Sequence, residues 1–444
     1  MSGGARKRPA PERRDRRTVA ARLVVGAAAV LPFIALAFDG VNQAAAAAAT
    51  AGVAMLLAAA AVLSFGGEHL IPAARARVPV IALAIALAAG TARIVFPLAG
   101  QDHDPDAILI ELAKIAGFAA CTVTGLLIAA DQRRLERLLA WLVYAGGAYL
   151  IVALVAGAPL IIHAGSTVDG RFGGTLANSN AAGCVFGMLA LLALGRTLAL
   201  VRRPEFYQLD TRHIAALGAA GAIAFFALGA CALTQSRTAL GGTVVLALAI
   251  LITNFRKGDK RTLRTALVVM ALVIAAAAML ELGDAITGRL GTLSADTASR
   301  WAAYRHLAGI IGEAPWLGHG LGSFITVNVT HLDAATVPTM WNWGAGHNIV
   351  LHALIEGGWA LTAPVLVVWG AIAVQIARGA SSVDGASAPA AAVVLAALCA
   401  SVDIALNVPA VAAFAALLLG VAWGSHALNA RRGSEARLLP ANRR

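Results

Sequence analysis

The sequence predicts an all-α polytopic membrane protein with about twelve transmembrane helices and one large periplasmic loop between helices nine and ten. Hydrophobic residues make up 59% and charged residues 13% of the chain, with a mean hydropathy of +0.77. Soluble domains have roughly 45–50% apolar and about 25% charged residues. Apolar runs long enough to cross ~30 Å of hydrocarbon recur along the whole chain. Together with the distribution of positive charge, these observations exclude an ordinary soluble domain.

The apolar runs divide the chain into five parts. We expect a basic tail over residues 1–18, helices one to nine within 19–282, the loop over 283–346, helices ten to twelve within 347–428 and a second basic tail over 429–444. The expected spans are Val19–Phe38, Ala44–Phe65, Val78–Ala99, Ala107–Ala130, Leu138–Ile162, Ala181–Leu200, Ile214–Leu233, Thr238–Phe255, Ala266–Leu282, Ile349–Ala373, Ala390–Leu406 and Val411–Leu428.

Positive charge predicts the orientation of the chain. The formal net charge is +12, and most of the 35 Lys and Arg residues fall in the two tails and in alternate loops. Because cytoplasmic loops carry the excess of Lys and Arg, we expect a multi-pass protein of the bacterial cytoplasmic (inner) membrane with both termini in the cytoplasm. The basic tails then face anionic membrane lipids, and nucleic acid is not an expected partner.

The large loop is predicted to contain an amphipathic helix over Thr297–Ile311. Its apolar positions have helical spacing, and its polar positions lie on the opposite face. The segment is too short and too polar to span the bilayer, so we expect it to lie against the membrane surface. The expected apolar face consists of Trp301, Tyr304, Leu307, Ala308 and Ile311, opposite Arg300, Arg305 and His306.

No metal or cofactor site is evident. All four cysteines fall within spans, where thiols behave as small apolar side chains, and no GxxxxGK[ST] sequence is present for direct use of ATP. The acidic run of Asp102, Asp104 and Asp106 lies in a short turn away from the other polar motifs. We therefore expect no cofactor and a chemistry without metal.

Three predicted helices begin at the outer face with polar motifs. Arg171 lies in GRFGGTLANSN before helix six, Arg237 in TQSRTALGG where helix eight begins, and His347 in GAGHN at the start of helix ten. Each helix N-terminus carries roughly half a positive charge from unpaired N–H groups. If the three ends converge, two guanidiniums and three helix ends form an anion site suited to a diphosphate.

Further polar residues on the outer side are secondary candidates. Arg300 and Arg305 lie in the amphipathic helix, Asn180 near the start of helix six, and Asn348 directly after His347. The arginines can equally anchor to lipid phosphate, and His347 with Asn348 can be a helix-capping pair.

Charged residues also occur at membrane depth. Arg93 lies in helix three, and Glu111 and Lys114 lie three residues apart in helix four. Such charges need partners, and a local ion-pair cluster and a substrate contact are both open.

Four stretches resemble the O-antigen ligase and O-antigen polymerase family, namely RFGGTLANSNAAG, SRTAL, SRWAAYRHLAGIIGEAPWLGHGLGSF and GHNIVLHALIEGGWAL. They occur in the family's order over roughly Gly170–Leu361, all on the predicted outer face. The ligase pattern of His-Asn and a spaced glycine is met by His347, Asn348 and Gly358. Leu361 stands where that pattern often has a small or polar residue, so ligase and polymerase both stay open.

The resemblance implies an inverting, metal-independent glycosyltransferase. Such an enzyme takes a glycan from undecaprenyl diphosphate and transfers it to lipid A–core or to a growing polysaccharide. By the same resemblance, Arg171, Arg237 and Arg300 bind the diphosphate, and His347 takes the proton of the acceptor hydroxyl. His319 and His331, then His306, are the next candidates for the base.

Two other classes of protein remain as alternatives. A secondary transporter of an anionic or lipid-linked solute is one, although transporters usually place charge near the bilayer midplane. A non-catalytic partner in an envelope assembly is the other.

Overall fold

The computed structural model is helical throughout the residues that it describes, which are 11–41, 43–66, 105–157, 171–202, 211–255, 300–334, 336–379 and 387–438. Two expected spans, Val78–Ala99 and Ala266–Leu282, lie outside these residues. Each of the other expected spans overlaps a helix.

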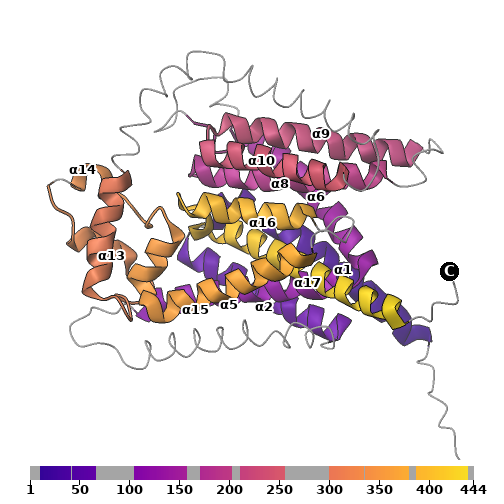
Figure 1. Ribbon diagram of the computed structural model, residues 1–444, viewed down its shortest axis with the longest axis horizontal. Coiled ribbons are helices and arrows are strands. Elements are labelled where there is room, and N and C mark those ends of the chain that lie inside the picture. The colour runs from indigo at the N-terminus through magenta and orange to yellow at the C-terminus, as the bar shows by residue number, and fades with distance from the viewer. Residues whose placement is uncertain are drawn as a thin grey trace, which may run out of the picture.

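Long helices run side by side and form the body of the molecule (Figure 1). Among the described residues, seven helices are long and apolar enough to cross a membrane, and three more apolar helices are shorter. They confirm a multi-pass helical protein, and the number twelve stays a prediction. In chain order the helices are α1 (Pro11–Ala37), α2 (Ala44–Phe65), α5 (Pro105–Ala129), α6 (Gln132–Ala156), α8 (Ser179–Val201), α9 (Thr211–Leu233), α10 (Arg237–Phe255), α15 (Ile349–Gly379), α16 (Ser387–Ala400) and α17 (Pro409–Leu438).

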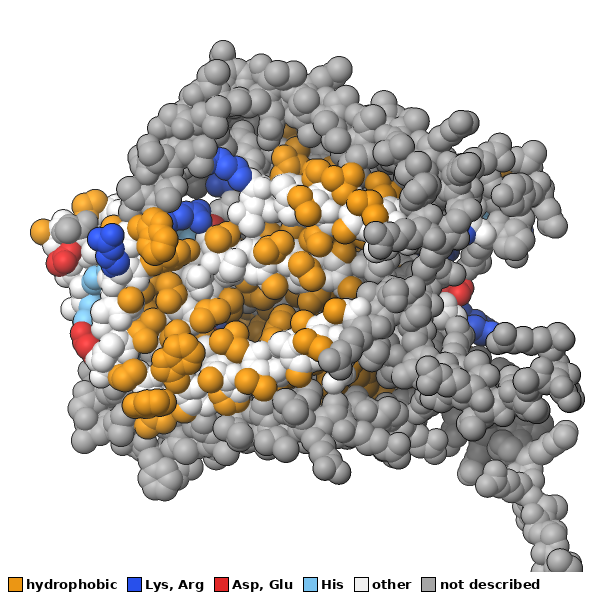
Figure 2. All heavy atoms as spheres, in the orientation of Figure 1, with side chains coloured by type: hydrophobic (Ala, Val, Ile, Leu, Met, Phe, Trp, Pro, Cys, Tyr) orange, Lys and Arg blue, Asp and Glu red, His pale blue; other side chains and the backbone are white. Residues whose placement is uncertain are grey.

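The outside of the bundle is apolar. Leu56, Leu63, Ile151 and Val155 are 65–84% exposed. On the face drawn in Figure 2, apolar side chains cover the middle, and the charged and histidine side chains of the described residues gather toward the two ends. An apolar band between polar ends is the surface that a bilayer requires.

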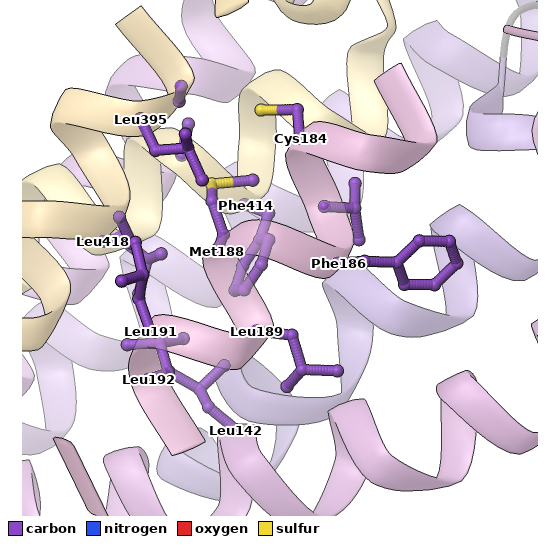
Figure 3. Packing of buried hydrophobic residues seen from close by; sticks show 14 of the residues in the cluster. Leu142, Cys184, Phe186, Met188, Leu189, Leu191, Leu192, Leu395, Phe414 and Leu418 are labelled. Carbon is purple, nitrogen blue, oxygen red and sulfur yellow. The ribbon is translucent and has the colours of Figure 1, made fainter. Parts of the chain in front are cut away.

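The core lies around α8, most of whose residues are buried. Side chains from α6, α8, α16 and α17 meet there, among them Leu142, Met188, Leu395 and Phe414 (Figure 3). Glycines allow the backbones to touch elsewhere, since a Cβ at Gly420 of α17 would overlap a backbone carbonyl of α5. Close packing of this kind holds membrane helices together where lipid removes the hydrophobic driving force between helices.

The expected boundary of one span, Leu138–Ile162, is wrong. α6 begins at Gln132 and ends at Ala156. The carboxylate of Asp131 accepts a backbone hydrogen bond from Arg134 (3.0 Å) and caps the helix ahead of its charged first turns. Hydropathy detects the apolar part of a helix and misses such a polar beginning.

The expected span Ala390–Leu406 is also wrong at its end. α16 ends at Ala400, and a turn over residues 401–404 leads to the short helix η4 (Ala405–Asn407). The backbone carbonyls of this turn are bound by side chains from other parts of the chain, as described below. Apolar runs flank the turn on both sides, so an average of hydropathy over a long window does not show the break.

Residues 300–348 form a small folded unit at one end of the bundle (Figure 1). The unit contains a helix over residues 300–313, then α13 (Phe324–Thr330) and α14 (Val337–Met340). Its core extends to the first turns of α15 and consists of Ala303, Leu307, Ile310, Phe324, Met340 and Ile355.

Residues 300–313 form a helix that overlaps the expected segment Thr297–Ile311, and its expected position against the membrane surface stays a prediction. The face that this helix buries within the protein includes one residue of the expected apolar face, Leu307. Ala303, Leu307 and Ile310 are buried, whereas Trp301 is 61% exposed and Ala308 is exposed. The buried positions recur at helical spacing, and they pack against α13, α14 and α15. Neighbouring elements of the loop therefore decide which face is buried.

α15 is broken at Gly358, which has φ +57° and ψ −168°. Only glycine adopts this conformation without strain. Four backbone hydrogen bonds of 2.7–2.9 Å join the opened helix to the loop, running from His319 to Ile355, from Gly320 to Glu356, from Trp359 to Pro315 and from Ala360 to Trp316. The break thus fastens the folded unit to the bundle.

Candidate active site

Arg171 joins the start of α8 to the turn before α10. Its Nε donates to the carbonyl oxygen of Thr234 (3.0 Å), and its Nη2 donates to Oδ1 of Asn180 (2.6 Å). Asn178 caps α8 by accepting a backbone N–H (2.8 Å). A Cβ at Gly183 would lie 2.6 Å from Oγ1 of Thr234, so α8 touches the turn directly. Arg171 and the beginnings of α8 and α10 therefore share one place in the molecule.

Asp403 links this place to the loop. It lies in the turn after α16 and is 4% exposed. Its Oδ2 accepts a hydrogen bond from Nδ2 of Asn180 (2.5 Å) and lies 3.9 Å from Nη2 of Arg300. Its Oδ1 accepts the backbone N–H of Ile404 (2.7 Å) and lies 3.8 Å from Nδ1 of His347. One buried carboxylate thus faces α8, the helix over residues 300–313 and the start of α15.

The turn that carries Asp403 is held by two of the sequence-predicted residues. Nη1 of Arg300 donates to the carbonyl oxygen of Val402 (2.6 Å), and Nδ2 of Asn348 donates to that of Ser401 (2.7 Å). Oδ1 of Asn348 accepts two backbone N–H groups of the first turn of α15 (2.9 and 3.2 Å). Carbonyls at a helix end lack helical partners, and these side chains supply them.

His347 is held in an uncommon conformation. Its φ is +47°, in the left-handed region that few residues other than glycine adopt. The hydroxyl of Tyr304 donates to its carbonyl oxygen (3.3 Å), and the ring centroid of Trp343 lies 4.2 Å from that of the imidazole. The side chain keeps 27% of its surface exposed, so the imidazole is fixed and still accessible.

The environment of His347 favours the neutral imidazole. Burial lowers its pKa below the ordinary value, the charge of Asp403 opposes this shift, and the charge of Arg300 adds to it. Burial is the largest of these causes. The distance of 3.8 Å between Nδ1 of His347 and Oδ1 of Asp403 is too long for a hydrogen bond. The carboxylate is still close enough to stabilise an imidazolium once one forms. Because Nδ1 faces Asp403, Nε2 is the nitrogen that is left to take a proton.

The other predicted residues fall into three groups. Arg237 is the first residue of α10 and is exposed, close in the chain to the turn that binds Arg171. Arg305 is exposed on the helix over residues 300–313. Arg93 lies outside the described residues. Glu111 and Lys114 form an ion pair with each other (2.5 Å).

The alternative histidines have partners within the loop. Nε2 of His319 lies 3.1 Å from the carbonyl oxygen of Ile310, and Nε2 of His331 lies 3.0 Å from a carboxylate oxygen of Glu313. In the part of the chain that the structure describes, no group of three or more His, Cys, Asp or Glu side chains could hold a metal ion.

Asp403 is the residue that our sequence reasoning missed. It lies within the expected span Ala390–Leu406 and was not singled out. An acidic residue at membrane depth nevertheless indicates a functional site by default. The motif SVDIALN places this aspartate beside two other polar residues. That combination is the signal that could have found it.

Comparison with known families identifies the domain that holds part of this site. Residues 222–366 match the model of the O-antigen ligase family. Over these residues the chain is similar to the O-antigen ligase family. The family resemblance of the motifs is thereby confirmed. No curated protein matches the chain.

The matched residues run from within α9 to within α15 and include Arg237, Arg300 and His347. Arg171 and Asp403 lie on either side of the matched residues. Their contacts with Thr234, Arg300 and His347 join them to the matched region.

Proposed function

We propose that the protein transfers a glycan from a polyprenyl (undecaprenyl) diphosphate carrier to an acceptor hydroxyl at the periplasmic face of the bacterial inner membrane. The meeting of Arg171, Arg300 and His347 around Asp403 carries this proposal. The match to the O-antigen ligase family supports the class of reaction.

The charges of the site suit a diphosphate. Arg171, Arg237 and Arg300 bring three positive charges, against the one negative charge of Asp403. A guanidinium has five N–H donors in a rigid fork that fits phosphate oxygens. The N-termini of α8 and α10 add partial positive charge. These groups stabilise the negative charge that develops on the leaving diphosphate.

The proton of the reaction goes to His347. The acceptor hydroxyl oxygen attacks the anomeric carbon while Nε2 of His347 takes the hydroxyl proton, and the bond from that carbon to the diphosphate oxygen breaks. The bonding electrons leave with the diphosphate, and attack from the opposite face inverts the anomeric centre. Asp403 stabilises the imidazolium that forms on His347.

The orientation of the site follows from positive charge. Lys and Arg concentrate in the tails and in alternate loops, and this distribution supports a position of the loop unit outside the cytoplasm. No ATP or nucleotide sugar is present there, so the donor must arrive already activated. A lipid-linked diphosphate is such a donor.

The reaction needs no metal ion in this proposal, because arginines and helix ends neutralise the diphosphate. EDTA should leave turnover of the purified protein unchanged. Loss of activity that Mg²⁺ or Mn²⁺ restores would move the site toward the acidic run at Asp102.

The direct test uses protein in proteoliposomes with a synthetic polyprenyl-diphosphate glycan and an acceptor. We expect His347→Ala to lose about 10²–10⁴-fold in turnover with donor binding retained. Arg171→Ala or Arg300→Ala should weaken donor binding as well as turnover, because their charges meet the diphosphate in the ground state. Arg133→Ala, at an exposed position at the start of α6, is the control. More than about a tenth of wild-type turnover in His347→Ala would contradict the proposal.

The acceptor is tested in cells by deleting the gene. If the protein is a ligase, full-length polymer should accumulate on the lipid carrier and be absent from lipid A–core. Attachment of single repeat units only would identify a polymerase instead.

A further inference from the structure

A second polar cluster lies behind the His347 turn. His352 and Glu356 are one turn apart on α15, and their side chains are 15% and 8% exposed. Nε2 of His352 lies 3.5 Å from Oε1 of Glu356. The same Oε1 accepts the backbone N–H of Phe324 at the start of α13 (3.3 Å). The carboxylate is thus fixed by the loop unit and in turn faces the imidazole.

The other ring nitrogen of His352 faces the turn that carries His347. The backbone N–H of Gly346 donates to Nδ1 of His352 (3.3 Å). A nitrogen that accepts a hydrogen bond carries no proton, so the ring proton is on Nε2 and points toward Glu356. A Cβ at Gly346 would lie 3.2–3.3 Å from atoms of His352, so the turn also packs directly on this residue.

The turn requires such support. The left-handed φ of His347 is strained for a residue with a side chain, and strain persists only where the surroundings fix it. Tyr304 holds the carbonyl side of His347, and Asn348 holds the side toward α15. The N–H side is held by His352.

We infer that His352 is a positioning residue for His347, which it holds in place through the backbone N–H of Gly346. The inference rests on the proposed function, because it takes His347 as the general base. His352 touches no reacting atom. It sets the direction in which Nε2 of His347 meets the acceptor hydroxyl.

Charged groups of the described residues act on both histidines. His347 faces Asp403 and Arg300. His352 faces Glu356, and Glu111 and Lys114 of α5 act on it at longer range as an ion pair. The two histidines therefore lie in separate electrostatic surroundings and are joined through the backbone.

The test compares three substitutions at His352 in the full chain in proteoliposomes, with the synthetic polyprenyl-diphosphate glycan as donor. His352→Leu removes the acceptor for Gly346. His352→Asn places a carbonyl oxygen near the position of Nδ1, and His352→Gln places its amide near the position of Nε2. We expect the Leu and Gln variants to lose about 10–100-fold in kcat, with KM for the donor unchanged within about threefold. The Asn variant should regain most of the wild-type kcat.

The pH profile gives a readout that a purely structural role would not move. If the turn loosens, His347 becomes more exposed. The pH at which kcat falls on the acidic side of the profile should then shift up toward about 6.5, the ordinary imidazole pKa. It should stay at the wild-type position in His352→Asn. Equal kcat in the Asn and Gln variants would overturn the inference, even if the Leu variant does not fold.

His347→Ala, measured in parallel, separates the two proposals. An inactive His347→Ala with a fully active His352→Leu contradicts the positioning role alone. An active His347→Ala contradicts the proposed function and the positioning role together.

Discussion

Asp403 has two opposing effects at the scale of a single residue. Its negative charge favours the imidazolium of His347, and it also lies among the arginines that would bind a diphosphate. A substitution that removes the charge of Asp403 and keeps its shape separates these effects. It should slow proton transfer to His347, and it should not weaken binding of the donor.

We expect Asp403→Asn to lower turnover by about 10²–10⁴-fold, since the imidazolium formed during the reaction loses its carboxylate. The pKa of His347 should fall further below its ordinary value, because burial and Arg300 then act unopposed. The acid limb of the pH profile should therefore move to lower pH. Donor binding should be retained or strengthened. An acid limb that stays in place would show that Asp403 does not act on the base.

The wild-type protein should lose activity only at acidic pH. A base whose pKa is lowered is neutral and competent above that pKa, and activity falls as pH drops through it. The half-point of kcat in proteoliposomes should thus lie below about 6.5. A half-point above this value would contradict a buried His347 as the base.

At this scale the sequence indicated the side chains to which we assign the chemistry, but it did not indicate the side chains that orient them. Arg171, Arg300 and His347 lie in motifs near predicted helix ends, where charged residues need an explanation. Asp403 and His352 lie in apolar runs. Their roles depend on tertiary contacts with Asn180 and Gly346, which sequence periodicity does not contain.

At the scale of elements, the break in α15 decides how the loop unit meets the bundle. A Cβ at Gly358 would overlap the backbone of Trp316 and add strain at a positive φ. Gly370 lies in the same helix with open space around it. The two glycines therefore form a matched pair.

We expect Gly358→Ala to destabilise the protein by about 1–3 kcal/mol or more, from backbone strain together with the overlap. Gly370→Ala should change stability by no more than about 0.5 kcal/mol. Thermal unfolding in detergent measures both. Equal stability of the two variants would show that the four hydrogen bonds between loop and helix contribute little.

The sequence predicted which segments are helices and was weaker on where they end. A long apolar run is what a helix needs to cross lipid, so the apolar runs predicted every span that lies in the described residues. The polar first turns of α6, the end of α16 and the buried face of residues 300–313 depend on caps and neighbours. Such contacts are not encoded in hydropathy.

At the scale of the whole molecule, the proposed orientation can be tested with thiol labelling. Cys184, Cys231 and Cys399 are 0–3% exposed, and the partly exposed Cys121 lies within the apolar helix α5. A protein with its native cysteines should therefore react little with a reagent that does not enter the membrane. Thr326 lies exposed in α13 of the loop unit, and Arg133 lies exposed at the start of α6.

We expect Thr326→Cys to react with a membrane-impermeant reagent in cells whose outer membrane has been permeabilised. Arg133→Cys should react only after lysis. The reverse pattern would place the candidate site in the cytoplasm. The proposal of a lipid-linked donor would then fail.

The break in α15 also bears on the order of events during biogenesis. Residues 315–320 leave the ribosome before residues 355–360, and in the proposed orientation they have been exported before α15 enters the bilayer. A helix inserted already broken would expose unpaired N–H and C=O groups to hydrocarbon, each costing several kcal/mol. We therefore expect α15 to insert as a continuous helix and to open at Gly358 when the exported segment docks. The active site is then completed after translation, as a step separate from membrane insertion.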